Sequence, residues 1–431
     1  MPKKQRKVKR YRNIYRGSIT SSPVFKAGAV VAGVAVVAAA GWLLYEPVYN
    51  WATNLGESVS QGSSSQTAEP SSSGGMLDGF LGGEEGSSSQ SVPEATDPAA
   101  AQTLHAVYMP ESILMDASAR SSFIADCVAN GYNSIYFDLK DSAGVVTYRS
   151  GLSQITELGS ASASAVDLAS VVSEMKNAGI TPIGRIYAFQ DPLAAAANLD
   201  AAVHYQDSEW AWLDNSASLG GQPWLNPVSD YAQQYIMDLA REAAAAGVQQ
   251  IVLDAVTFPV GYSLEMASYG RTLSDAEKSQ VLADFIAAVD EAVHQAGGES
   301  AVYLSAPTLL TGSTDQYGSD PFLLTGSGVL LGVMPASFGS VFSSADLAME
   351  APVQQPYQTV SSALAALGSQ LQTEEVSVLL QGYTSDTISA LMNKTYTAAD
   401  VEEQIRAAQE AGYEDYVIFS PSGDYSILFT E

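Results

Sequence analysis

The sequence predicts a (β/α)8 barrel of the TIM type, preceded by one transmembrane helix and a disordered linker. Three observations predict this: strand-like and helix-like segments alternate after residue 103, an uncharged apolar run lies near the amino terminus, and a Ser- and Gly-rich stretch separates the two. With 431 residues, 46% of them hydrophobic, the chain can form one large core with accessory segments. We therefore divide it into a basic tail (1–26), a membrane span (27–45), a linker (46–102) and a barrel (103–431).

The first segments concern location. Residues 1–26 hold nine of the 19 Lys and Arg side chains and no Asp or Glu. Ala27–Tyr45 carries no charge, and as a helix it would span ~28 Å, about one hydrocarbon core. Because basic flanks stay cytoplasmic, we expect a single-pass anchor in the cell membrane with the barrel outside the cell. The alternative is a cleaved signal peptide with Ala38–Ala40 as its cleavage site, although the apolar run continues beyond it.

Composition excludes several classes of function. Residues 46–102 have the Ser-, Gly-, Glu- and Pro-rich character of a flexible tether. Beyond residue 26, only 10 basic side chains accompany all 47 acidic ones, so the barrel would repel phosphate backbones and we expect no nucleic-acid partner. The single cysteine, Cys127, excludes an intramolecular disulfide and a thiolate-rich zinc site. The three histidines are scattered, so no metal or other cofactor is expected.

Eight apolar runs have the length of strands, and helical patterns lie between most of them. The predicted strands are Leu104–Met109, Ser134–Leu139, Ile180–Tyr187, Gln250–Val256, Ala301–Ser305, Val329–Met334, Val376–Gln381 and Tyr416–Ser420. The clearest helical patterns are Val166–Ala178, Tyr231–Ala246, Asp275–Ala296, Gln358–Leu371 and Ala398–Ala411. Several helices are expected to end at a glycine, namely Gly131, Gly179, Gly247, Gly297 and Gly412.

Two places fit the alternation less well. Thr308–Ser319 is expected to be a loop, so that only Pro321–Leu324 starts a helix before the sixth strand. Pro182 is expected to delay the third strand to Ile183. A doubly wound open sheet is the alternative fold, but Tyr108–Ser112, after the first strand, lacks the Gly-rich phosphate loop typical of it.

In a barrel of this kind the chemistry lies at the carboxyl ends of the strands. The second strand ends in Asp138, Lys140 and Asp141, and the fourth contains Asp254. Paired carboxylates are what glycoside hydrolysis needs, one as proton donor and one as nucleophile or base. Structural roles are the alternative: Asp141 as a loop cap, Lys140 as the partner of a neighbouring Asp, and Asp254 as a solvated strand end.

Other polar and aromatic residues near strand ends are candidates to line a cleft and bind substrate. They are Lys140, Tyr148, Arg185, Tyr187, Asp191, Trp224, Gln381 and Tyr383. For the aromatic members, core packing is the alternative role.

Several of these segments resemble a bacterial family of barrel proteins described as glycoside hydrolases. Phe137–Tyr148 meets every fixed position of its D-x-K-D-x-x-G-x-V-x-Y pattern. Gly184–Pro192 resembles its R-I-x-x-F-x-D-P segment, Trp224–Pro227 its W-x-N/D-P, and Leu253–Pro259 its F-D-Y-x-R-F-P. The resemblance extends over residues 104–431 and implies a barrel that acts on polysaccharide or cell-wall glycan.

Departures from the family pattern concern the site. Ala255 replaces its Tyr and Thr257 its Arg, and Thr cannot orient a carboxylate with a guanidinium fork. Gly382 stands where the family's W-L-Q-D-F segment has an acid. If that acid is the proton donor, Asp138, Asp141 or Asp191 must replace it beside Asp254.

Three hypotheses follow. The first is a membrane-anchored extracellular glycoside hydrolase with Asp254 as nucleophile or base and Asp138 or Asp141 as acid. The second is a catalytically degenerate barrel that binds glycan or organises partners in the cell envelope. The third is an interaction scaffold without a sugar ligand, which uses its acidic surface.

Overall fold

The structure, a computed structural model, describes residues 103–312, 315–326, 328–386 and 391–429. The basic tail, the predicted membrane span and the linker (1–102) lie outside this part. Among the described residues, no helix combines the length and the apolar character needed to cross a membrane.

Eight parallel strands form a closed barrel, which confirms the predicted fold. They are β1 (His105–Met109), β2 (Ser134–Lys140), β5 (Thr181–Tyr187), β7 (Gln250–Asp254), β9 (Glu299–Ser305), β10 (Gly328–Gly332), β13 (Val376–Gln381) and β14 (Tyr416–Phe419). Each pairs with the next in chain order, and β1 pairs with both β2 and β14, so the sheet has no free edge among these eight strands. All eight coincide with the apolar runs predicted as strands.

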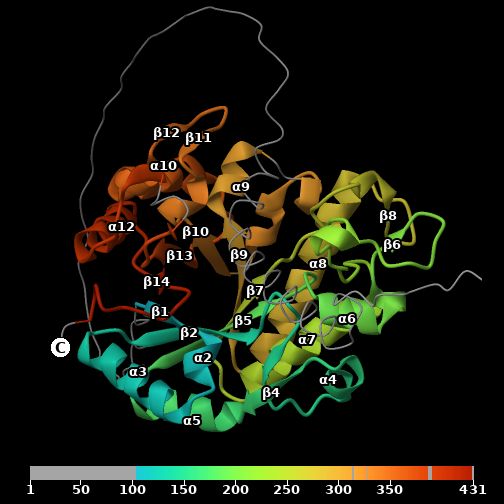
Figure 1. Ribbon diagram of the computed structural model, residues 1–431, viewed down its shortest axis with the longest axis horizontal. Coiled ribbons are helices and arrows are strands. Elements are labelled where there is room, and N and C mark those ends of the chain that lie inside the picture. Colours follow the sequence, from blue (N-terminus) through green and yellow to red (C-terminus); the bar gives the residue numbers. More distant parts are fainter. Residues whose placement is uncertain (1–102, 313–314, 327, 387–390, 430–431) are drawn as a thin grey trace, which may run out of the picture.

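Helices surround the barrel on the outside (Figure 1). They are α2 (Glu111–Leu114), α3 (Ala117–Ala129), α4 (Ser153–Leu158), α5 (Leu168–Asn177), α6 (Pro192–Ala197), α7 (Asp230–Ala245), α8 (Asp275–Gln295), α9 (Ala306–Thr311), α10 (Pro356–Leu367) and α12 (Ala398–Glu410). The five glycines expected to end helices all have positive φ angles, as a left-handed C-terminal position requires.

Two local predictions were wrong. Pro182 lies inside β5, paired with Ile135 of β2. The first pair of β5 with β7 is Ile183 with Gln250, so Pro182 precedes that ladder and its missing N–H removes no bond from it. The segment Thr308–Ser319, expected to be a loop, starts inside α9, which accepts a proline in its first turn because the amides there have no intrahelical partner. The helix expected to start at Pro321–Leu324 is a 3-10 helix, Pro321–Gly326.

Shorter strands extend the connections between barrel strands. β3 (Val146–Tyr148) pairs with the end of β2 and with β4 (Ala161–Val166). β11 (Val341–Ser343) pairs with β12 (Ala348–Glu350), and β6 (His204–Tyr205) with β8 (Ala267–Ser268). β6 and β8 stand at one edge of the molecule, away from the barrel strands (Figure 1).

The core has two main parts. The larger lies between the strands and the surrounding helices. The smaller fills the barrel interior with alternate residues of successive strands, including Tyr136, Ile183 and Val252. Because side chains alternate between the two faces of a strand, the residue two positions after each of these also points inward, at the carboxyl end of the barrel. Those residues are Asp138, Arg185 and Asp254.

Candidate active site

The candidate site is built around Arg185 on three adjacent strands. Asp138 of β2 is the direct neighbour of Arg185 on β5, and Tyr187, two residues later on β5, is the neighbour of Asp254 on β7. All three charged side chains are nearly buried, with about a tenth of each exposed. Three of the residues singled out from the sequence are therefore brought together at the strand ends.

Asp138 is the main partner of Arg185. The guanidinium donates from Nε to Oδ1 at 2.5 Å and from Nη2 to Oδ2 at 3.1 Å. The hydroxyl of Tyr108, from the end of β1, also donates to Oδ2 at 2.8 Å. This bidentate, charge-assisted geometry fixes both side chains. Asp138 therefore holds Arg185 in place, with both of its oxygens already engaged.

Asp254 is held more loosely by the same guanidinium. Its Oδ2 lies 3.5 Å from Nη1 of Arg185. Its Oδ1 accepts the backbone N–H of Ala255 at 2.7 Å, and a hydrogen bond with Tyr187 also favours the ionised form. Burial nevertheless raises the pKa of Asp254 above its ordinary value, because it outweighs the stabilising effects of Arg185 and the hydrogen bonds. Asp254 is thus a buried carboxylate with a raised pKa, a feature that is frequent among catalytic groups.

Aromatic rings enclose the guanidinium of Arg185. The distances from its central carbon to the ring centres are 4.7 Å for Tyr187, 5.4 Å for Tyr136, 5.5 Å for Tyr108 and 5.8 Å for Phe419. Burial alone would lower the pKa of Arg185, but Asp138 reverses this effect and the net shift is upward. Arg185 is therefore a permanent positive charge between two carboxylates.

Two further carboxyl groups lie near the mouth of the barrel. Oδ1 of Asp141 accepts the backbone N–H groups of Ala143 at 3.0 Å and Val145 at 2.7 Å, so this residue caps the turn after β2. Burial, with a contribution from the charge of Asp138, raises the pKa of Asp141. Burial also raises the pKa of Glu111, and the charges of Asp141 and Asp138 add to the effect. Reasoning from the sequence missed Glu111, although its position directly after the first strand was a signal.

Lys140, the last residue of β2, forms an ion pair with Asp191 at the start of α6. Both side chains are fully buried, with 2.8 Å between Nζ and Oδ2. Lys140 also donates to the carbonyl of Tyr187, and Asp191 caps α6 by accepting the N–H of Ala194 at 2.8 Å. A Cβ at Gly144 would lie 2.1 Å from Oδ1 of Asp191, so only glycine fits there. Lys140 and Gly144, two fixed positions of the D-x-K-D-x-x-G-x-V-x-Y pattern, therefore support the end of β5 and the segment that follows it.

The other predicted substrate-binding residues are placed differently. Tyr148 is buried and donates to Oε2 of Glu242 on α7 at 2.9 Å. Trp224 is buried beside Trp212 and donates to Oδ2 of Asp214 at 3.2 Å. Within the described part of the chain, the hydrogen bonds of these two side chains go to Glu242 and Asp214 and not to Asp138, Arg185 or Asp254.

Gln381 and Tyr383 lie at the end of β13. The buried side chain of Gln381 accepts the N–H of Ala336 at 2.7 Å and donates to the carbonyl of Tyr383 at 2.8 Å, which fixes the backbone of this region. The ring of Tyr383 meets Phe419 edge to face, with 6.3 Å between ring centres. Of the predicted aromatic residues, Tyr187 and Tyr383 are thus the ones associated with the Arg185 cluster.

Gly382 has a steric explanation. A Cβ at this position would lie 2.5 Å from Cγ2 of Ile418 on β14. With the present backbone, an acidic side chain would collide with the neighbouring strand. The acid of the family pattern therefore cannot simply be restored at this position.

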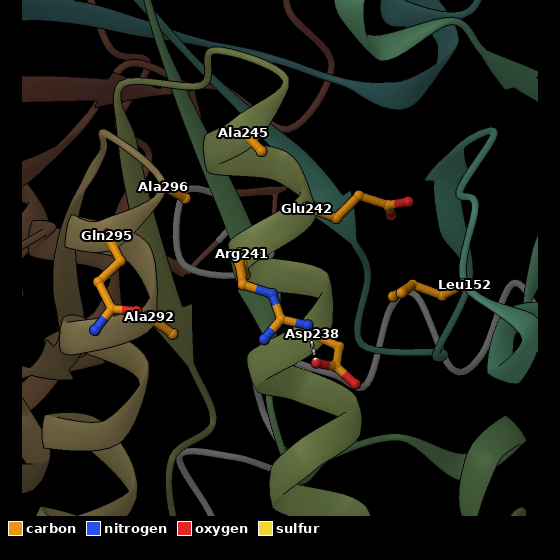
Figure 2. A pocket seen from close by; sticks show the side chains of 8 residues that line it. All are labelled: Leu152, Asp238, Arg241, Glu242, Ala245, Ala292, Gln295 and Ala296. Atoms are coloured by element: carbon orange, nitrogen blue, oxygen red, sulfur yellow. Dashed lines mark hydrogen bonds and ion pairs between the residues drawn. The ribbon is translucent and has the colours of Figure 1, made fainter.

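Elsewhere the described residues offer a pocket but no cluster of metal ligands. Within the described ranges, no three His, Cys, Asp or Glu side chains are placed to share a metal ion. A cavity of about 410 Å³ lies between α7 and α8, where Arg241 forms an ion pair with Asp238 (Figure 2). None of the residues around Arg185 lines it.

The model of a family described as "Putative glycosyl hydrolase domain" matches residues 106–425. No curated protein matches the sequence.

Solved structures resemble the barrel at low sequence identity. The glycoside hydrolase domain of PgaB (BpsB) from Bordetella bronchiseptica is 14% identical over 75% of this chain and 95% of that one, with a TM-score of 0.52. A hypothetical protein from Ruminiclostridium thermocellum is 23% identical over 43% of this chain and 91% of that one, with a TM-score of 0.38. The catalytic domain of β-amylase from Paenibacillus polymyxa is 11% identical over 74% and 93%, with a TM-score of 0.45. The Bordetella domain supports the barrel fold.

Proposed function

The chain belongs to the family described as "Putative glycosyl hydrolase domain", and we propose that its barrel hydrolyses polysaccharide with Asp254 as the central carboxylate. The observation that carries this proposal is the position of Asp254. It lies at the carboxyl end of a barrel strand, beside a fixed guanidinium, and burial raises its pKa.

In this mechanism Asp254 acts in its ionised form. It attacks the anomeric carbon or activates a water molecule, and it stabilises the positive charge that develops on the sugar ring. Arg185 and the N–H of Ala255 fix the orientation of its two oxygens. A raised pKa brings a base closer to the working pH and makes it a stronger proton acceptor.

The proton donor is assigned to the mouth of the barrel. Asp138 is poorly placed to donate a proton to a substrate, because both of its oxygens already accept hydrogen bonds from Arg185 and Tyr108. Glu111 and Asp141 have raised pKa values and so retain a proton to higher pH than ordinary carboxyl groups. One of these two protonates the leaving oxygen, while Asp138 positions Arg185.

Glycan binding without cleavage is the second candidate function. It is favoured by the contact of one guanidinium with both Asp138 and Asp254, because each carboxylate loses part of its freedom to reach a substrate. It is also favoured by Gly382, where the family pattern has an acid. In this case the aromatic rings around Arg185 would remain as the floor of a binding cleft.

The proposal includes a location at the outer face of the cell membrane. Its support is the sequence: a basic tail at 1–26, an apolar run at Ala27–Tyr45 and a flexible linker at 46–102. A tether of this kind would let the barrel reach polysaccharide near the surface while it remains attached.

The test is release of reducing ends by the full-length chain in mild detergent, on a panel of plant and cell-wall polysaccharides. Asp254→Asn should lower the rate by about 10²- to 10⁴-fold, the usual contribution of an acid–base or nucleophilic carboxylate. Asp126→Asn, the same chemical change on the exposed face of α3, should leave the rate unchanged. Retardation of the wild type in a polysaccharide gel without any release would instead support glycan binding.

A further inference from the structure

The connections after β5 and β7 build a separate lobe on the carboxyl-end side of the barrel. It consists of residues 202–226 and 255–270, and we call it the aromatic lobe. β6 pairs with β8, and bridges join Ala202 to Leu225 and His204 to Ala211. The lobe stands at the edge of the molecule that carries β6 and β8 (Figure 1).

Two aromatic side chains of this lobe face solvent. Trp210 is 79% exposed and Tyr262 is 71% exposed. Among the described residues, no other Trp, Tyr or Phe side chain is classed as exposed. Leu219, 74% exposed, belongs to the same lobe. Large aromatic surfaces left in water are costly, so their concentration on one lobe indicates a binding surface.

The backbone that carries these rings is held in place. Trp210 donates its N–H to Oγ of Ser208 at 3.0 Å and accepts the N–H of Tyr205 at 3.0 Å. The N–H of Tyr262 donates to the carbonyl of Asp214 at 2.7 Å. Such a frame presents the two rings with little loss of backbone entropy on binding.

Two buried tryptophans support this frame from inside. The indole N–H of Trp212 donates to the carbonyl of Ser263 at 3.1 Å, and that of Trp224 donates to Oδ2 of Asp214. A Cβ at Gly261 would lie 2.4 Å from the carbonyl oxygen of Asp214, which shows how closely the two halves of the lobe approach. The exposed rings and the buried ones therefore belong to one packed unit.

The lobe is joined directly to the strand ends of the site. The N–H of Ala188 donates to the carbonyl of Asp254 at 2.7 Å, and that of Phe189 to the carbonyl of Ala255 at 3.3 Å. Leu225, inside the lobe, donates its N–H to the carbonyl of Phe189 at 3.0 Å. Backbone hydrogen bonds therefore connect the lobe to the end of β7, where Asp254 lies.

We propose that the aromatic lobe is a subsite that binds a neutral polysaccharide by stacking sugar rings on Trp210 and Tyr262. The apolar C–H faces of pyranose rings match flat aromatic faces, while their hydroxyl groups remain in water. Asp207 and Glu209 precede Trp210 in the same loop, and Glu265 follows Tyr262 closely, so the surface disfavours an anionic glycan. The inference rests on the proposed function, because family membership identifies glycan as the occupant.

The test compares variants of the full-length chain in mild detergent for retention on insoluble cellulose, chitin and peptidoglycan and in gels of xylan. The double variant Trp210→Ala, Tyr262→Ala should bind the polysaccharide that retains the wild type about tenfold more weakly. A double variant with Phe instead of Ala at position 210 should keep part of this binding. Leu391→Ala, at a residue that is also 74% exposed but lies outside the lobe, is the matched control. On a cleaved polymer the double variant should raise KM, with little change in turnover of a short substrate.

The outcomes separate this inference from the proposed function. Loss of polymer binding in the lobe variant supports the subsite even if no polysaccharide is hydrolysed. Unchanged binding overturns the subsite, while hydrolysis that depends on Asp254 would still support the proposed function. The subsite is also overturned if the wild type binds none of these polymers. It is overturned as well if light scattering shows that the lobe variant has lost self-association while its glycan binding is unchanged.

Discussion

At the scale of single residues, Asp138 and Asp254 have opposite relations to their environment although both contact Arg185. Asp138 is matched by a bidentate guanidinium and a tyrosine hydroxyl. Asp254 has a contact of 3.5 Å, and burial raises its pKa. The first arrangement stabilises the folded chain, whereas the second keeps a carboxylate in a costly environment that suits chemistry.

This difference predicts opposite effects on stability. Asp138→Asn should lower the free energy of unfolding by about 3–5 kcal/mol, because it breaks a buried ion pair. Asp254→Asn should leave it unchanged or raise it at neutral pH, because it removes a charge that burial disfavours. Urea titrations followed by tryptophan fluorescence measure both values. An equal loss of stability in the two variants would contradict the distinction.

At the scale of secondary-structure elements, the ion pair of Lys140 with Asp191 connects the end of β2 to the start of α6. Lys140→Met should cost about 3–5 kcal/mol, because Asp191 would stay buried without its partner. Adding Asp191→Asn should recover at least half of this loss, since asparagine still caps the helix. Thermal and urea unfolding of the three variants test the coupling, and additive losses would show that the two residues act independently.

The strands were predictable for a physical reason. Strands of a parallel barrel are buried on both faces, so each is a continuous apolar run, and glycines mark the ends of the helices between them. β6 and β8 of the aromatic lobe were not predicted, because each is only two residues long and they pair across the segment that contains α7 and β7. β4 was not predicted because Ala161–Val166 consists mostly of Ala and Ser and is largely exposed, so it has no apolar run. α9 was missed because a helix of six residues is too short to show a helical apolar period.

The site was predictable in part. The rule of strand ends identified Asp138, Arg185 and Asp254 together. It did not show that Lys140 lies among the helices, because alternation along β2 would point Lys140 to the same side as Asp138. A register shift between these two residues changes that direction, and Lys140 instead lies 6.0 Å from the ring centre of Tyr235 on α7. Glu111 was missed because it belongs to a short helix and to no strand.

At the scale of the whole molecule, we propose that a membrane anchor holds an acidic barrel outside the cell. The full-length chain should fractionate with membranes, resist extraction by salt, and be labelled on its barrel by a membrane-impermeant reagent in intact cells. Deletion of residues 27–45 should leave the barrel unlabelled inside the cell. Release into the medium with a new amino terminus after Ala40 would support the cleaved signal peptide instead.

The most direct test of the central claim is the pH dependence of the rate of polysaccharide cleavage. Asp254 must be ionised to act, and burial raises its pKa above the usual value near 4, so kcat/KM should fall as the pH decreases through that raised pKa. We predict an acid limb with its midpoint above pH 4, and cleavage by Asp254→Asn that is about 10²- to 10⁴-fold slower than the wild type at neutral pH. A full rate maintained down to pH 4, or cleavage by Asp254→Asn at the wild-type rate, would contradict this prediction.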